Sequence, residues 1–169
     1  MEDKAMFKST ILTPIYAITM MVLLSSCSAV NTKVGGVLDL DTDFQLSFVV
    51  DENINPDDNK VPSPVIIRMY ELKSTKLFEK ANFIDLYERD SEVLGKSLIG
   101  QQVLKAVQPS EQRTANFVLS KDTQYIGLYV EFLQFENAKY KVTIPIAQTN
   151  VVSSSAKVQL SENTISILK

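Results

Sequence analysis

The stretch "FQLSFVV" (Phe44–Val50) sets the fold, together with "VIIRMYEL" (Val65–Leu72) beyond a polar connection. In the first stretch, apolar side chains alternate with polar ones, which is typical of a strand buried on one face. The second stretch is apolar on both faces except at Arg68 and Glu71, which predicts a central strand. The chain therefore opens its folded part with two strands joined by a loop.

The residues after these strands first take on helical spacing and then return to strand patterns. The segment near Phe83 and Leu86 has helical periodicity, with Asn82 as the expected N-cap and Gly95 as the expected end. Further strands are predicted in "QQVLKAV", "QRTANFVL", "QYIGLYVEFLQF" (Gln124–Phe135), "KYKVTIPIA", "SAKVQL" and "TISIL". Seven or so short strands with regular turn signals predict an antiparallel β-sandwich, with a helical insertion at about 75–100.

The N-terminal residues have the features of a secretory signal. The apolar segment "ILTPIYAITMMVLL" follows lysines, contains Pro14 and ends in small residues. It is shorter than the roughly 20 apolar residues of a membrane-spanning helix. We expect residues 1–26 to be a lipoprotein signal peptide, residues 27–37 a lipidated tether, and residues 38–169 the β-sandwich domain.

The cysteine at the end of this segment is the expected site of lipid attachment. "LSSC" (Leu24–Cys27) resembles a bacterial lipobox, and Cys27 is the only cysteine of the chain. A single cysteine cannot form an intramolecular disulfide. Ser28, rather than Asp, at the next position favours outer-membrane localisation. A chance cysteine after a plain signal peptide remains an alternative.

Composition excludes several classes of function. The chain has no histidine, so His-based triads and His metal ligation are excluded. Seven acids and no base lie between Val34 and Asn59, which disfavours nucleic acid and suits a basic protein partner. No pattern in the sequence supports catalysis, so we expect a protein that is not an enzyme.

The acidic loop between the first two strands offers the best candidate for a metal site. In "DENINPDDNKVP", Asp51, Asn53 and Asn55 occupy the first ligand positions of an EF-hand-like loop. The match then fails, because Pro56 replaces the glycine and Pro62 the bidentate glutamate. We expect no metal here.

Arg68 and Glu131 are charged residues in otherwise apolar predicted strands. They could form a buried pair, but charged side chains on strands more often face solvent. We therefore expect both to face solvent.

About forty residues resemble the TssJ lipoproteins of bacterial type VI secretion systems. The stretch is "NINPDDNKVPSPVIIRMYELKSTKLFEKANFIDLYERDSEVLG". The matching positions, in order, are Asn55–Pro56, Ser63–Pro64, Arg68, Tyr70, Leu72–Lys73, Phe78, Ala81–Asn82–Phe83 and Leu86–Tyr87. Tyr140 and Lys141 stand where the family often has Trp and Arg, which indicates a divergent member.

The resemblance implies a transthyretin-like two-sheet β-sandwich with a small helical insertion. It implies a lipoprotein with no cofactor beyond a covalent lipid on Cys27, held in the outer membrane and facing the periplasm. The implied partner is the periplasmic C-terminal region of TssM and, indirectly, TssL.

In the family, the loop between the first two strands carries the TssM contact, and here that loop is Asn53 to Ser63. The expected partner-binding residues are Asn53, Ile54, Asn55, Pro56, Asp57, Asp58, Asn59 and Lys60. Among them, Ile54 and Pro56 are expected to supply the apolar centre of the contact, and Asp57 and Asp58 to steer a basic partner. The alternative is a lipoprotein module that captures a small ligand between its sheets.

Overall fold

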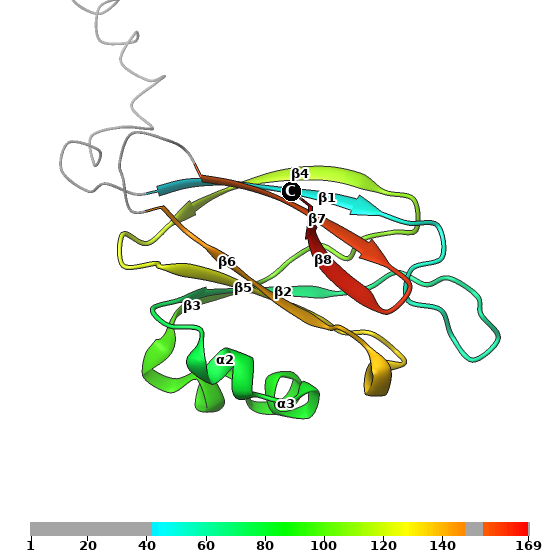
Figure 1. Ribbon diagram of the computed structural model, residues 1–169, viewed down its shortest axis with the longest axis horizontal. Helices are drawn as coiled ribbons and strands as arrows, with labels where there is room; N and C mark the ends of the chain where they lie inside the picture. Colours follow the sequence, from blue (N-terminus) through cyan, green and yellow to red (C-terminus); the bar gives the residue numbers. More distant parts are fainter. Residues whose placement is uncertain (1–41, 148–153, 169) are drawn as a thin grey trace, which may run out of the picture. The chain divides into compact units, whose positions relative to one another are not determined.

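The computed structural model describes residues 42–147 and 154–168, which form eight strands and a small helical layer (Figure 1). The predicted signal peptide, the tether and Cys27 lie outside the described residues. The elements are β1 (Thr42–Val50), β2 (Ile67–Leu72), α2 (Lys76–Lys80), α3 (Phe83–Leu94), η1 (Gly95–Ser97), β3 (Leu98–Val103), β4 (Gln112–Leu119), β5 (Tyr125–Val130), η2 (Phe135–Asn137), β6 (Lys141–Pro145), β7 (Ser154–Ser161) and β8 (Thr164–Leu168).

The strands are arranged in two four-stranded sheets. The first has the order β4-β1-β7-β8, and the second has the order β3-β2-β5-β6. The second sheet is antiparallel throughout. In the first sheet, β1 runs antiparallel to β4 but parallel to β7, so the sandwich that was predicted as antiparallel contains one parallel pair of strands. β7 starts at the same end of the sandwich as β1, because Phe44 pairs with Ser154.

The alternation in β1 is confirmed as the basis of the core between the sheets. Phe44, Leu46, Phe48 and Val50 are all at most 4% exposed, and they pack against the inward residues of β2, β5 and β7. Gln45, which alternates with them, is exposed on the outer face. The alternation with a period of two residues thus places one face of β1 in the core and the other face in solvent, as the sequence predicts.

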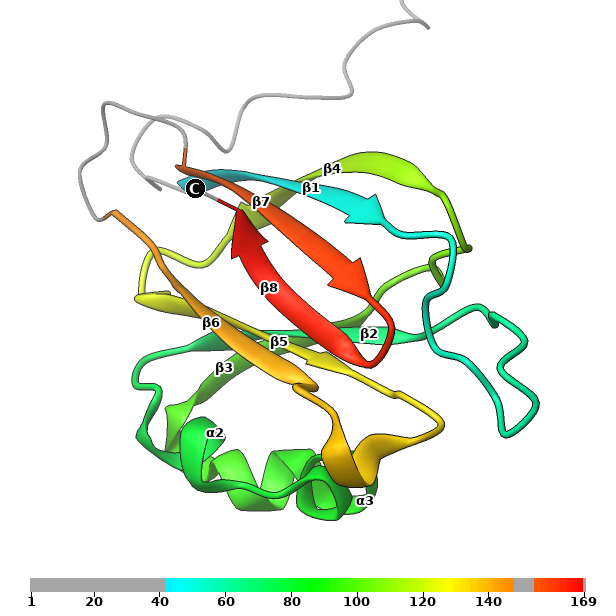
Figure 2. The ribbon, with the colours of Figure 1, turned by 45° about the vertical axis from the view of Figure 1, so that its right-hand side comes forward.

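The helices cover the outer face of the second sheet (Figure 2). β2 and β5 are therefore buried on both faces, which explains their almost uninterrupted apolar sequences. Tyr70 and Tyr129 contribute to a second apolar cluster under the helices. Gly127 makes this packing possible, because a Cβ there would lie 3.0 Å from atoms of both Leu72 and Phe78.

The capping signals of α3 are confirmed. Asn82 accepts a hydrogen bond from the backbone N–H of Asp85, and Asp85 accepts one from the backbone N–H of Asn82, which completes a capping box. The helix ends at Gly95, whose φ is +46°. The sequence did not predict the kink at Arg89 within α3.

The strand predicted over Gln124–Phe135 is shorter than expected. β5 ends at Val130, because the backbone N–H of Phe132 bonds to the carbonyl of Val130 and turns the chain out of the ladder. The chain then passes through η2 to β6. Pro145 stands at the end of β6, an edge strand, where the missing backbone N–H of proline is tolerated.

Candidate functional site

The β1–β2 loop, residues 51–66, projects from one end of the sandwich (Figure 1). Backbone hydrogen bonds fix its first half to neighbouring segments: Asp51 N–H donates to the carbonyl of Leu160, and Asn55 N–H donates to that of Glu162. The side chain of Asn53 also donates to Glu162. The loop is thus attached to the β7–β8 turn before it reaches its tip.

Asn55 anchors the base of the loop. Its φ is +48°, a conformation that Asn tolerates better than most residues, and it is only 2% exposed. Its side-chain amide donates to the carbonyl of Pro64 (3.0 Å) and its side-chain oxygen accepts from the backbone N–H of Leu133 (2.8 Å). One buried side chain therefore joins both arms of the loop to the segment that follows β5.

Ile54 is part of the core and not of the loop surface. It is 0% exposed and belongs to the apolar cluster between the sheets. The expectation that it supplies the apolar centre of a contact was therefore wrong. The physical reason is that a loop of this length gains stability by burying an aliphatic side chain at its base.

Asp57 shapes the tip of the loop. One of its carboxylate oxygens accepts hydrogen bonds from the backbone N–H groups of Asn59 and Val61, both at 2.8 Å. Its own backbone N–H donates to Val61, and its carbonyl accepts from Lys60, whose φ is +63°. This carboxylate satisfies backbone groups that a polar tip would otherwise expose.

The exposed residues of the loop differ from the predicted set. Asn53, Asp58, Asn59 and Lys60 are exposed, whereas Pro56 and Asp57 are half-buried. Val61 is 55% exposed, and the neighbouring Pro62 is exposed as well. Val61 was missed by the sequence reasoning, although an aliphatic residue between a lysine and a proline in a polar loop was the available signal.

One hollow adjoins the loop, and a second hollow shares Gln134 and Asn163 with it. The first, of about 440 Å³, is lined by Asn53, Pro56, Asp57, Asp58, Lys60, Gln134, Glu162 and Asn163. The second, of about 360 Å³, is lined by Leu133, Gln134, Phe135, Glu136, Asn137 and Asn163. The side-chain oxygen of Asn163 is buried and has no hydrogen-bond partner among the residues that the structure describes. The surface at this end is therefore formed by three segments: the β1–β2 loop, the β5–β6 connection and the β7–β8 turn.

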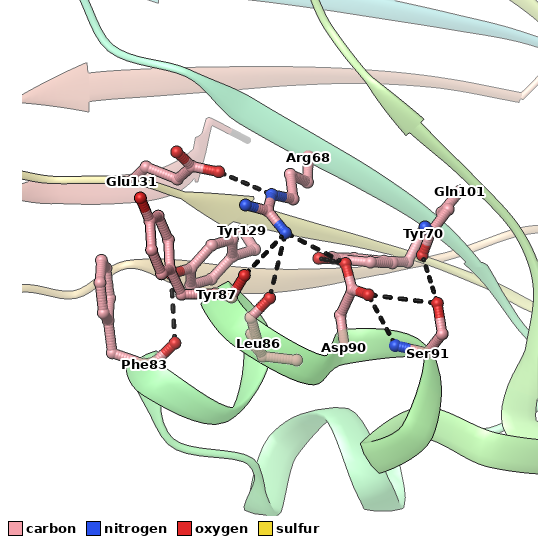
Figure 3. Close-up of polar contacts among 10 residues, drawn as sticks. All are labelled: Arg68, Tyr70, Phe83, Leu86, Tyr87, Asp90, Ser91, Gln101, Tyr129 and Glu131. Carbon is pink, nitrogen blue, oxygen red and sulfur yellow. Dashed lines mark hydrogen bonds and ion pairs between the residues drawn. The ribbon is translucent and has the colours of Figure 1, made fainter.

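Arg68 and Glu131 form a pair behind this surface (Figure 3). Arg68 Nε donates to Glu131 Oε1 at 2.6 Å, and their side chains are only 21% and 15% exposed. The expectation that both face solvent was wrong, because α3 covers this side of β2. Burial opposes the charge on Arg68, but the contacts with Glu131 outweigh it and raise the Arg68 pKa.

The same guanidinium group holds α3 where that helix is kinked. Arg68 Nη1 donates to the carbonyls of Leu86 and Tyr87 and to Asp90. The kink at Arg89 interrupts the backbone hydrogen bonds of the helix that these two carbonyls would otherwise accept. Arg68 donates to the carbonyls in their place. The network thereby fixes helix, strand and Glu131, which precedes Leu133 by two residues.

Asp90 is the acidic centre of this network. It accepts hydrogen bonds from Tyr70 (2.9 Å) and from the backbone N–H of Ser91 (2.6 Å) (Figure 3). Burial alone would raise the pKa of Asp90, but the hydrogen bonds from Tyr70, Ser91 and Arg68 lower it. Burial and then Asp90 raise the pKa of Tyr70. The contacts connect β2 to α3 and are those of a structural cluster.

The acidic loop does not gather metal ligands. Within residues 42–147 and 154–168, no three His, Cys, Asp or Glu side chains lie where they could share an ion. Asp51 instead accepts hydrogen bonds from Gln159, and the side chain of Asn55 is hydrogen-bonded to the backbone of Pro64 and Leu133. None of the helices in this part of the chain is long and apolar enough to cross a membrane.

These features define the class of protein: a two-sheet β-sandwich with helices on one face and a three-segment surface at one end. A family model described as "Type VI secretion lipoprotein, VasD, EvfM, TssJ" matches residues 42–163. The chain belongs to this family, the TssJ lipoproteins of type VI secretion systems, as the sequence resemblance predicted. It is a family of secretion-system lipoproteins rather than of enzymes. No curated protein matches the chain.

Solved structures share the fold, which confirms the predicted fold class. The crystal structure of the lipoprotein TssJ1 from Pseudomonas aeruginosa is 22% identical, with a TM-score of 0.69 over 76% of this chain and 95% of that one. A chain of a structure titled "Type VI membrane complex" is 22% identical, with a TM-score of 0.67 over 76% and 98%. A chain of a structure titled "T6SS protein TssM C-terminal domain (869-1107) from EAEC" is 20% identical, with a TM-score of 0.65 over 76% and 98%.

Proposed function

We propose that the protein is a non-enzymatic adaptor that docks the periplasmic C-terminal region of TssM while acyl chains on Cys27 hold it in the outer membrane. Through TssM it is linked indirectly to TssL. Family membership supports this role, and so does the similarity to a chain of the structure titled for the TssM C-terminal domain. The observation that carries the proposal is the β1–β2 loop, which projects from the sandwich and is fixed at its base by Asn55.

The proposed contact combines a steering rim with a small apolar centre. Asp58 and Lys60 are exposed on the rim, where charges mainly affect association rate and specificity. Val61 and Pro62 supply the exposed apolar surface, in place of the buried Ile54. The prolines of the loop restrict its free conformations, which lowers the ordering cost of binding.

The path from the anchor to the loop suits mechanical linkage. β1 runs directly from Thr42 at one end of the sandwich to Val50 at the foot of the loop. It lies between β4 and β7 and pairs with both along its length. A force applied along β1 is shared by all of these hydrogen bonds at once, because they lie perpendicular or slanted to the direction of the strand.

The alternative function is the capture of a small ligand between the two sheets. A ligand held between the sheets needs space there, but that region is filled by the side chains of the core, among them Phe44, Phe48 and Leu128. The hollow lined by the loop and the one next to it lie at the end of the sandwich and not between the sheets.

A substitution at the loop tip tests docking. Val61→Asp should weaken the affinity for the TssM periplasmic domain by about tenfold or more, as expected for a hot-spot residue. Val118→Asp is the matched control, because Val118 is 66% exposed on β4. Titration calorimetry measures both; equal affinities for the two variants contradict the proposal. Deleting the loop is a poorer test, because it removes the buried Ile54 and Asn55.

A second substitution tests the anchor. Cys27→Ser removes the thiol that takes the lipid, so the protein should move from the outer-membrane fraction to the soluble periplasmic fraction. Unchanged outer-membrane localisation of this variant contradicts acylation at Cys27.

A further inference from the structure

Each sheet of the sandwich has two edge strands, and β4 differs from the other three. It is eight residues long, pairs with β1 without a register shift, and contains neither proline nor lysine. Within the described residues, no strand pairs with β4 on its other side (Figure 2). A long, regular edge of this kind is open to pairing with a further strand.

The other three edges are short or interrupted. The pairing of β3 with β2 shifts its register next to Leu72. β6 has five residues and ends with Pro145. β8 also has five residues, and its first residue, Thr164, forms a bridge with Lys139. Because short strands, prolines and irregular pairing all oppose the addition of a strand, β4 is the edge best suited to accept one.

The free side of β4 presents the backbone groups of four residues. Val50 N–H donates to the carbonyl of Glu111, the residue just before β4. The direction of these groups alternates along an antiparallel strand, so every second residue from Arg113 onward bonds to β1 and the residues between them point their N–H and C=O groups away from it. The outward residues are Gln112, Thr114, Asn116 and Val118, and all four side chains are exposed.

A second copy of β4 fits this edge in a two-fold symmetric register. When two copies pair antiparallel around an axis at Ala115, all four outward residues of one copy lie opposite outward residues of the other, and their backbone groups can bond. Thr114 then lies opposite Asn116 of the second copy. Ala115 lies on the axis, in the kind of pair whose side chains approach most closely, and its small side chain fits there.

Arg113 and Phe117 lie opposite each other in the same register. Phe117 is half-buried against Phe44, with 6.4 Å between the ring centroids, and an added strand would cover its exposed part. An inward charge can oppose pairing at an edge. The guanidinium group of Arg113, however, has its contacts within its own chain, 5.3 Å from the ring centroid of Phe48 and donating to the carbonyl of Lys105 at 2.7 Å. Arg113 is the only charged residue of β4, so no like charges face each other in the paired strands.

We propose that β4 is an interface through which two copies of the chain pair edge to edge. The two four-stranded sheets that contain β4 would then join into one sheet of eight strands. Backbone hydrogen bonds between outward residues hold the pair together, and Ala115 and Phe117 of both copies lose contact with solvent. The β1–β2 loop is not part of this edge, so the pairing is independent of the proposed function.

A cysteine on the proposed axis tests the register. The test uses the whole chain in mild detergent, with Cys27→Ser in every variant, so that the introduced cysteine is the only thiol. Ala115→Cys should form a disulfide-linked dimer under mild oxidation, because the two Cα atoms of such an opposite pair are about 4.5 Å apart, within the range of a disulfide.

Val118→Cys is the matched control. Val118 is 66% exposed on the same strand, but its two copies lie about 20 Å apart in this register. On non-reducing gels, Ala115→Cys should therefore cross-link about tenfold or more faster than Val118→Cys, although position 115 is the less exposed of the two.

A pair of charge variants tests the same register at exposed positions, where the fold is kept. Thr114→Lys together with Asn116→Lys places lysine opposite lysine across the interface and should weaken dimerisation by about tenfold. Thr114→Glu together with Asn116→Lys changes the same two positions but places glutamate opposite lysine, and should keep or strengthen dimerisation. Sedimentation equilibrium without oxidant measures the association, and the rate of cross-linking in the Ala115→Cys background should follow it.

The outcomes decide between a second copy and other occupants of the edge. Faster cross-linking at position 115 than at 118, together with dependence on the sign of the charges, supports the pairing. Equal or slower cross-linking at position 115, or equal effects of the two charge variants, overturns it. A purified chain that stays monomeric also overturns it, and protection of the thiol at position 115 by added TssM periplasmic domain would then assign the edge to a strand of that protein.

Discussion

The side-chain oxygen of Asn55 accepts a hydrogen bond from the backbone N–H of Leu133 at 2.8 Å, across 78 positions of the chain. The same side chain donates to the carbonyl of Pro64. Asn55 therefore acts as a positioning residue, because it fixes the β1–β2 loop to the segment that lines one of the neighbouring hollows.

Asn55→Asp tests this role with little change in shape. The carboxylate can still accept from Leu133 but cannot donate to Pro64, so the carbonyl of Pro64 loses its donor and a charge is placed at a buried position. We expect a loss of about 1–3 kcal/mol in the free energy of unfolding, measured by urea denaturation. Asn59→Asp makes the same charge change at an exposed position of the loop and should cost much less. Equal losses in the two variants would show that charge, and not the hydrogen bonds of Asn55, is responsible.

Arg68 is expected to be among the most sensitive positions for stability. Arg68→Met leaves Glu131 and Asp90 partly buried without their cation and leaves two helix carbonyls without their donor. We expect a loss of about 2–4 kcal/mol in the free energy of unfolding, slightly below the range for fully buried pairs. A double-mutant cycle with Glu131→Gln isolates the coupling of the pair.

Arg89→Met is the control for Arg68. Arg89 also forms an ion pair, with Asp85, but its side chain is 57% exposed. Exposed ion pairs contribute little to the free energy of unfolding, so this variant should have the same midpoint of urea denaturation as the wild type. If both arginine variants are as stable as the wild type, the network around Arg68 does not stabilise the fold.

The strands and the helix cap were predictable because their signals are local. The alternation at Phe44 and Leu46 and the capping pattern from Asn82 to Asp85 lie within a few residues of each other. The position of the candidate loop was predictable for the same reason, since polar residues and prolines separate two strand patterns. Its membership of a docking surface came only from the family resemblance and stays a proposal.

The internal structure of that loop was not predictable. In the sequence, Ile54 is an apolar residue within a polar loop. Its burial depends on strands that are distant in sequence. Likewise, Arg68 and Glu131 are 63 positions apart, and the pairing follows from α3 covering β2. Neither contact has a periodicity or a local partner that would reveal it.

We expect Asp90 to make the free energy of unfolding fall at acid pH. Its pKa is lowered in the fold, so it binds fewer protons there than in the unfolded chain, where its pKa is about 3.9. Its contribution is therefore present above about pH 4 and is lost as the pH falls through the lower folded pKa. Asp90→Asn should be less stable than the wild type at pH 7 and should lose less stability between pH 6 and pH 3. Chemical denaturation at these pH values measures the difference, and an unchanged loss in the variant contradicts the assignment.

We expect Lys141 to stabilise α2, a helix of five residues that is too short to be stable alone. Its ammonium group donates to the carbonyls of Phe78, Glu79 and Ala81 at the end of this helix, and burial lowers its pKa, an effect that Glu79 partly offsets. Lys141→Met keeps the length of the side chain but removes these donors.

We expect the amide hydrogens of Lys76–Lys80 to exchange faster in Lys141→Met, and the free energy of unfolding to fall by about 1–3 kcal/mol, because three carbonyls at the end of the helix lose a charged donor. Hydrogen exchange followed by NMR measures the local effect. Lys139→Met, two residues earlier and exposed, should leave the exchange of α2 unchanged. Equal exchange of α2 in the wild type and in Lys141→Met would mean that packing of Phe78 and Leu72 against β5, and not this lysine, holds the helix on the sheet.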